Sequence, residues 1–182
     1  MARNSTRARP ISAEWLMRAA IHYVERYDTS TENLRKVLRR KVARRAAAAG
    51  EAPAPHEPLV EATVARLVEL GLVDDQAYAQ ARLSSLRRKG ASRVMTTAKL
   101  IEKGLPREIV EATLQSDETE EAEAAASYVR RRRFGPHRSP GRGDRREREI
   151  AAMVRAGFPL GVAVGAIDAA ADPVDASSPE EN

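Results

Sequence analysis

Residues 71–114 read GLVDDQAYAQARLSSLRRKGASRVMTTAKLIEKGLPREIVEATL, and this stretch decides the fold. Gly71 follows a run of apolar residues at helical spacing, and glycine is the residue that most easily adopts the left-handed conformation after a helix. Asp74 or Asp75 can accept hydrogen bonds from the free amides of a new helix, which places Tyr78 in its first turns. That helix is predicted to run to about Lys89.

Two glycine-centred breaks divide the rest of this stretch. Gly90-Ala91-Ser92 ends the first helix, and a second helix is predicted from Arg93 to about Lys103. Gly104-Leu105-Pro106 then leads into a third helix over residues 107–115, because proline lacks the amide that a helix start leaves unpaired. We therefore expect a three-helix unit over residues 72–116.

The same junction occurs again later in the chain. Lys103-Gly104-Leu105-Pro106 is matched by Ala156-Gly157-Phe158-Pro159, and the apolar positions that follow also coincide. Any tight junction between helices can look like this, but the match favours a repeat. It predicts a third unit over residues 117–171, with helices at 119–134, 145–156 and 160–170 and a Gly-, Pro- and Arg-rich loop at 135–143.

The residues before Gly71 fit the same plan more loosely. Helices are predicted over residues 13–27, from Ser30 onward, and from Leu59 to Gly71, with a Pro-rich loop at 50–58. They form a first unit over residues 12–71, preceded by a disordered basic arm at 1–11. Residues 172–182 are predicted to be an acidic disordered tail. The predicted fold class is all-α, with three tandem three-helix repeats in an elongated, curved array.

Composition supports helices and a binding role. Only 4% of the residues are aromatic, and Ala, Leu, Arg and Glu, all good helix formers, recur throughout the chain. The net charge of +5 is unevenly spread, since residues 1–45 hold twelve Lys or Arg and only four acids. A polyanion is the expected partner, although a single charge cluster is often only a solvated helix face.

Several classes of function are disfavoured by the residues themselves. The chain has no cysteine, which excludes disulfides and thiolate chemistry and fits the cytoplasm, and it lacks the roughly 20 apolar residues of a membrane span. His22, His56 and His137 lack metal-ligand spacing, and helix capping explains Asp74 and Asp75 better than acid–base catalysis does. Without a Walker-type phosphate loop either, we expect no enzyme activity and no cofactor.

The quoted stretch resembles the central repeat of the RecX family. The resemblance rests on Gly71-Leu72-Val73-Asp74-Asp75, Tyr78-Ala79, the basic run Arg87-Arg88-Lys89-Gly90, Ser92-Arg93 and Lys103-Gly104-Leu105, and with the flanking units it covers about residues 12–170. It implies an all-helical, three-repeat protein that contacts RecA and RecA-coated single-stranded DNA. It also implies inhibition of RecA filament extension, ATPase, strand exchange and stimulated LexA cleavage, which would modulate recombination and the SOS response. Longer loops at residues 46–58 and 135–143 limit residue-by-residue transfer to the central unit.

Two basic sets are the candidate contacts with RecA or DNA phosphates. The central set is Arg82, Arg87, Arg88, Lys89 and Arg93, and the arginine-rich set of the third unit is Arg130, Arg131, Arg132, Arg133, Arg138, Arg142, Arg145 and Arg146. The second set flanks a Gly-Pro loop and is interpreted as a flexible phosphate clamp without sequence readout, because no aromatic residues alternate with its arginines. The structural motif residues are Gly71, Asp74, Asp75, Tyr78, Gly104, Pro106, Gly157 and Pro159.

Two other functions compete with RecA regulation. The first is a helical DNA-binding regulator that acts directly on DNA without RecA, using a helix pair as a helix-turn-helix. The second is a helical-repeat adaptor for an acidic protein, with no role for DNA. Weak nonspecific binding to DNA alone and a monomeric state are expected for the RecA regulator.

Overall fold

The computed structural model describes residues 10–139 and 145–169, and within these ranges the chain is all-α, as predicted. The predicted basic arm up to residue 9, the acidic tail from residue 170 and residues 140–144 of the arginine-rich loop lie outside the described residues. The helices are α1 (Ala13–Val24), α2 (Thr31–Ala49), α3 (Glu57–Glu69), α4 (Asp75–Arg88), α5 (Arg93–Glu102), α6 (Arg107–Gln115), α7 (Glu121–Arg132), α8 (Arg146–Arg155) and α9 (Leu160–Asp168), with short 3-10 helices η1 (Ala54–His56) and η2 (Gly135–His137).

The helices belong to two compact units. From here on, the first unit means residues 1–80 and 101–110, and the second unit means residues 81–100 and 111–182. These two units differ from the three predicted repeats. The predicted three-repeat plan, its boundaries and the curved shape of the array stay predictions.

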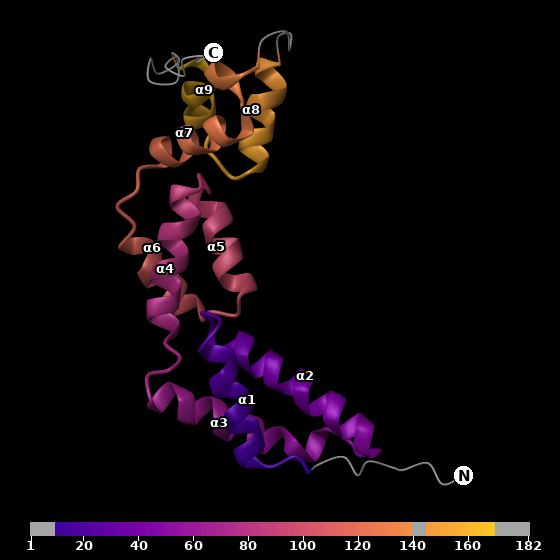
Figure 1. The fold of residues 1–182 in the computed structure, drawn as a ribbon. Helices are drawn as coiled ribbons and strands as arrows, with labels where there is room; N and C mark the ends of the chain where they lie inside the picture. Colours follow the sequence, from indigo (N-terminus) through magenta and orange to yellow (C-terminus); the bar gives the residue numbers. More distant parts are fainter. Residues whose placement is uncertain (1–9, 140–144, 170–182) are drawn as a thin grey trace, which may run out of the picture. The chain divides into compact units, whose positions relative to one another are not determined.

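The first unit is built around α1, α2 and α3, which pack against one another (Figure 1). Its core holds Leu16, Leu34, Leu38, Val60 and Leu67, all inaccessible to solvent. These positions recur at helical spacing, so one apolar stripe on each helix faces the other two. Trp15 is half-buried at the edge of this core, and the Arg45 guanidinium carbon lies 4.3 Å from the centre of its ring.

The second unit is centred on α7, α8 and α9, and α9 contacts both other helices (Figure 1). Its core is rich in alanine, as the composition predicts, with Met153 and Phe158 as its largest buried members beside Tyr128. The Tyr128 and Phe158 rings meet edge to face, with centroids 5.4 Å apart. Two small helical cores therefore replace one large core.

Local capping signals place most helix starts correctly. Ser12 caps α1 through the Trp15 amide, and the Asp74 carboxylate accepts the amides of Gln76 and Ala77 at 2.8 and 3.0 Å. Leu105 and Phe158, the apolar residues after the two junction glycines, are buried as expected. The cap assigned to the Asp74-Asp75 pair thus belongs to Asp74.

Several predicted boundaries are wrong. The first helix ends at Val24 instead of residue 27, and the predicted loop at 50–58 contains η1 and the first turn of α3. The predicted helix at 119–134 is shortened to α7, which ends where Arg133 adopts the left-handed conformation at φ 55°. Pro106 and Pro159 each lie one residue before a helix, where proline's fixed φ is tolerated.

A serine hydroxyl joins two helix ends in each unit. In the first unit, Ser30 precedes α2, and its Oγ accepts the Asn33 amide at 3.2 Å and donates to the Lys103 carbonyl at 2.5 Å. In the second unit, Ser92 precedes α5, and its Oγ accepts the Met95 amide at 3.1 Å. The same hydroxyl donates to the Ala156 carbonyl at 2.6 Å, beyond the end of α8. We call this arrangement the serine interlock.

An acidic residue completes each serine interlock. The Asp75 carboxylate, at the start of α4, accepts the Thr31 amide at 2.7 Å. The Glu121 carboxylate, at the start of α7, accepts the Arg93 amide at 3.2 Å. In both cases the first residue of one helix pairs with the first amide of another, and the negative charge also favours that helix N-terminus. The two interlocks involve the residues just before Gly104 and Gly157, the two glycines of the junction that the sequence repeats.

Gly157 lets the second interlock close. Its φ is +89°, and a Cβ atom there would lie 2.7 Å from the Ser92 hydroxyl and 2.8 Å from the Val94 Cβ. A larger residue would therefore be strained and would also separate the hydroxyl from the Ala156 carbonyl.

The Ser92→Ala variant tests the interlock. It removes a helix cap and a buried hydrogen bond together, so we expect it to lower the free energy of unfolding by about 1–3 kcal/mol, measured by urea denaturation followed by circular dichroism. The control is Ser84→Ala on the exposed face of α4, which should change stability by less than about 0.5 kcal/mol. Equal stability of the two variants would contradict the interlock.

Candidate polyanion-binding site

Arg87, a member of the predicted basic surface, is buried. Its exposed fraction is 1%, and it is among the largest fully buried side chains of the described chain. Its Nε lies 2.8 Å from the Asp117 carboxylate and its Nη1 lies 2.8 Å from the Glu121 carboxylate. Its two Nη atoms also donate to the carbonyls of Ala91 and Thr119. The prediction of Arg87 as a surface contact is wrong.

This ion-pair cluster fastens the segment before α7 to the end of α4. The Asp117 side chain is also buried, with 3% of it exposed, and its carboxylate accepts the Thr119 amide. Arg93 joins the cluster from the exposed side by donating to the Leu114 carbonyl at 2.6 Å. A buried charge is tolerated only with such partners, so Arg87 is a structural residue.

Two arginines of the predicted phosphate clamp are also engaged. Arg138 forms a two-pronged ion pair with Glu149, at 2.8 and 3.1 Å, and Arg146 pairs with both oxygens of Asp168. The hydrogen bond from Arg146 lowers the pKa of Asp168 below its ordinary value. Arg142 lies outside the described residues.

Glu149 holds this region together. Its carboxylate is 7% exposed and also accepts the Gly135 amide at 2.8 Å, which ties η2 to α8. Burial by itself would raise the pKa of Glu149, but the hydrogen bonds from Arg138 and Gly135 outweigh it and hold that pKa below its ordinary value. Glu149 is therefore ionised and paired at neutral pH.

Five other cations of the second unit line a cleft. Its volume is about 360 Å³, and its basic side chains come from four segments: Lys89 after α4, Lys99 on α5, Arg131 and Arg132 on α7, and Arg155 on α8. We call these five residues and the space between them the basic cleft. It brings together members of both predicted sets, which the sequence had left as separate patches.

Close backbone contact builds the cleft. Gly90 has a φ of +75°, and a Cβ atom there would lie 2.3 Å from the Tyr128 amide nitrogen, so only glycine allows the end of α4 to touch α7. Lys89 is thereby placed beside Arg131 and Arg132. Ser92 and Ala156, which form the serine interlock, also line the cleft and bring Arg155 to it.

The charge of the cleft is uncompensated. No Asp or Glu lines it, and none of its five cations has a carboxylate partner among the described residues. The guanidinium carbons of Arg131 and Arg132 lie 5.9 and 5.5 Å from the centre of the Tyr128 ring, which helps to position them. Such a cleft suits phosphate or carboxylate groups of a polyanion.

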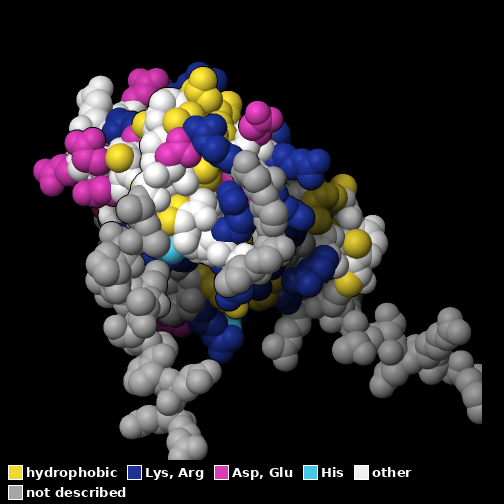
Figure 2. Space-filling model, turned by 90° about the horizontal axis from the view of Figure 1, so that it is seen from above, with side chains coloured by type: hydrophobic (Ala, Val, Ile, Leu, Met, Phe, Trp, Pro, Cys, Tyr) yellow, Lys and Arg dark blue, Asp and Glu magenta, His cyan; other side chains and the backbone are white. Residues whose placement is uncertain are grey.

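Sequence reasoning missed Lys99 and Arg155. Neither residue belongs to a basic run, and the hydrogen bond between Ser92 and Ala156, 64 positions apart in the chain, helps to bring their helices together. The other predicted residues lie elsewhere in the second unit: Arg88, Arg133 and Arg145 are exposed and Arg82 is half-buried. Figure 2 shows Lys and Arg side chains across the middle of one face and acidic side chains toward one side.

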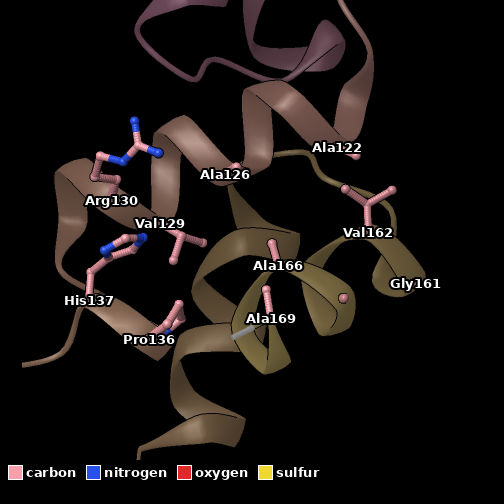
Figure 3. Close-up of a pocket in the computed structure, with 11 residues that line it drawn as sticks. Ala122, Ala126, Val129, Arg130, Pro136, His137, Gly161, Val162, Ala166 and Ala169 are labelled. Carbon is pink, nitrogen blue, oxygen red and sulfur yellow. The ribbon is translucent and has the colours of Figure 1, made fainter. Parts of the chain in front are cut away.

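A second cavity, of about 430 Å³, lies between α7, η2 and α9 and differs in character. Figure 3 shows Ala126, Ala166 and Ala169 along it and Arg130 and His137 together at one end. Its lining is mostly small and apolar, and both Arg130 and His137 already have interaction partners. Within the described residues, no three His, Asp or Glu side chains gather as metal ligands.

Comparison with known proteins agrees with this architecture. Residues 74–114, which span α4, α5 and nearly all of α6, match the family model for the second three-helix domain of RecX. The chain is 40% identical over 170 residues to the Regulatory protein RecX of Myxococcus xanthus, with 91% of each chain covered. The chain belongs to the RecX family.

Other RecX proteins are similar over shorter stretches. The chain is 32% identical to the Regulatory protein RecX of Agrobacterium fabrum, with 79% of this chain and 77% of that protein covered. For a Regulatory protein RecX of Thermus thermophilus, the values are 38% identity with 72% and 78% covered. The RecX relatives are named regulatory proteins, so the predicted regulatory class is confirmed at that level. No solved structure matches the chain.

The sequence predicts no membrane-spanning segment, and this prediction depends on helix length and hydropathy. No helix in the part of this RecX chain that the structure describes combines the length and apolar character needed to cross a bilayer. The cytoplasmic location stays a prediction.

The role of Arg87 is tested by comparison with its neighbour. Arg87→Ala leaves the Asp117 carboxylate buried without its partner, so we expect a loss of about 3–5 kcal/mol in the free energy of unfolding. Arg88→Ala changes an exposed residue of the same type and should cost less than about 0.5 kcal/mol. Similar stabilities in urea denaturation would show that the buried cluster contributes little.

Glu149 predicts a pH dependence of stability. Because its pKa is lowered in the folded chain, its pairing contributes stability above the ordinary value of 4.5 and loses that contribution as the pH falls through the lowered pKa. The stability difference between the unsubstituted chain and Glu149→Gln should therefore shrink between about pH 5 and pH 3 in urea denaturation. Glu147→Gln, on the exposed face of α8, is the control and should show a smaller change.

Proposed function

We propose that this RecX chain binds RecA and RecA-coated single-stranded DNA and inhibits RecA activities, namely filament extension, ATPase, strand exchange and stimulated LexA cleavage. Through these activities it would modulate recombination and the SOS response in the cytoplasm. The observation that carries the proposal is the 40% identity to a RecX protein over 91% of both chains. The chain itself acts by binding, and nucleotide hydrolysis belongs to RecA.

The basic cleft is the proposed contact with the polyanion. Its five cations come from separate helices but share one cavity, so they can meet several neighbouring phosphates or carboxylates at once. Among the described residues, Tyr128 supplies the one aromatic ring at the cleft, and it is 8% exposed and lies near Arg131 and Arg132. It offers little surface for base stacking, so we expect binding without sequence readout.

This geometry favours a filament-directed regulator over a sequence-specific DNA-binding protein. A sequence-specific protein needs side chains that form directed hydrogen bonds with base edges, whereas cations around a cavity neutralise backbone charge. Binding to single-stranded DNA alone should then be weak and should fall steeply with salt. The chain is expected to act as a monomer.

The test is RecA ATPase on single-stranded DNA with increasing amounts of the chain. The Lys99→Ala/Arg155→Ala variant removes two cleft cations that have no carboxylate partner among the described residues, so folding should be preserved. We expect its half-inhibitory concentration to rise roughly tenfold, equivalent to about 1.4 kcal/mol. In oligothymidylate binding, the slope of log affinity against log salt should fall by about 1.4, since each lost phosphate contact removes about 0.7.

The matched control removes two exposed cations of the first unit by Arg26→Ala/Arg107→Ala. This variant carries the same change in net charge but leaves the cleft intact, so it should inhibit RecA like the unsubstituted chain. If the unsubstituted chain leaves the RecA ATPase unchanged, the proposed function is wrong. If the two double variants behave alike, the cleft is not the contact.

A further inference from the structure

The basic cleft holds more positive charge than its surroundings balance. Elsewhere in the second unit, Arg87 is paired with Asp117 and Arg138 with Glu149. The five cleft cations lack carboxylate partners among the described residues and repel one another across a cavity of about 360 Å³. An anionic group that enters the cleft is therefore stabilised even without a shaped ligand site.

The sequence supplies an anionic group close by in the chain. Residues 170–182 contain Asp172, Asp175, Glu180 and Glu181 and no Lys or Arg. They follow α9 in the sequence, and α9 belongs to the same unit as the cleft. Their number is enough to reach it, because 13 residues span up to about 43 Å when extended, whereas helices of 9–12 residues are about 14–18 Å long.

We propose that the acidic segment 170–182 occupies the basic cleft of its own chain and competes there with the polyanion. The segment then raises the charge density that a ligand needs for binding, since only a ligand with densely spaced negative charges displaces it. This inference shares the cleft with the proposed function and adds a regulation of that site, but its test requires no RecA.

The expected size of the effect follows from effective concentration. A short tether holds the segment at about millimolar concentration near the cleft, so a contact with a dissociation constant of about 0.1–0.5 mM is formed in most molecules. Competition of this strength weakens the apparent affinity for an external polyanion by about 3- to 10-fold. The effect should fade at high salt, because both partners are charged and solvent-accessible.

The first experiment neutralises the segment by Asp172→Asn, Asp175→Asn, Glu180→Gln and Glu181→Gln. Binding is measured with a fluorescent oligothymidylate of about 20 nucleotides and, by competition, with inorganic polyphosphate, which has no bases. We expect a gain in affinity of about 3- to 10-fold for both probes. A gain for the oligonucleotide alone would indicate a contact with bases and would overturn the proposal.

A matched control separates local competition from the change in net charge. The variant Glu25→Gln, Asp28→Asn, Glu108→Gln and Glu111→Gln neutralises four exposed acids outside the cleft and adds the same charge. It should gain no more than about twofold, because these exposed acids do not line the cleft and their charges are screened by salt. If the control variant gains as much as the segment variant, the long-range field of the protein explains the effect and the proposal is wrong.

The second experiment locates the contact. The segment substitutions are combined with Lys99→Ala/Arg155→Ala, and a shared contact predicts that most of the gain disappears in the combined variant. In NMR spectra without any ligand, neutralising the segment should shift the amide signals of Gly90 and Ala91, which line the cleft. A full gain in the combined variant, or unchanged amide signals, would place the segment elsewhere.

The remaining outcomes are also decisive. If the segment's effect grows with protein concentration, the occupant belongs to a second copy, and the intramolecular proposal is wrong. If RecA ATPase is unaffected by the chain but the segment variant still gains affinity for oligothymidylate, the proposed function fails and the competition stands. The reverse result, RecA inhibition without any gain, removes only the competition.

Discussion

One serine hydroxyl that serves two helix ends is the interaction on which the rest of the structure depends. An N-terminus with free amides and a C-terminus with free carbonyls are both costly to bury, and Ser92 satisfies one group of each between α5 and the end of α8. Ser30 does the same between α2 and Lys103. In units with small cores, these directed bonds fix the register that apolar packing alone would leave loose.

The buried Arg87 shows that neighbouring residues of one basic run can have different roles. Arg87, Arg88 and Lys89 look equivalent in sequence, but Ala79, Leu83 and Arg87 are spaced by four residues and are all buried. One member of the run therefore lies on the apolar face of α4 and pairs with Asp117, and the other two are exposed. This four-residue spacing could have indicated that Arg87 is buried. Counting the basic residues of the run treated all three as surface residues.

Local chemistry could be predicted, whereas long-range assembly could not. The helix starts at Ser12 and Asp74 and the glycine junctions followed from the sequence because each depends on residues within one or two turns. The basic cleft depends on Gly90 touching α7 and on a hydrogen bond between residues 64 positions apart. No local pattern marks Lys99 or Arg155, so the sequence indicated two separate basic sets and not the cleft that combines three of their members with these two residues.

The acidic residues explain why net charge is a poor guide to this surface. With 31 basic and 26 acidic residues, the chain would have only a weak positive field at any part of its surface if the charges were mixed evenly. However, Glu121 and Asp75 cap helices, Asp117 and Glu149 pair with buried or half-buried arginines, and Asp168 binds Arg146. Because folding engages these acids and leaves the cleft cations without them, the attraction for polyanions is concentrated at the cleft. The strength of that attraction is therefore set by which acids the helix junctions use, and only weakly by the total charge.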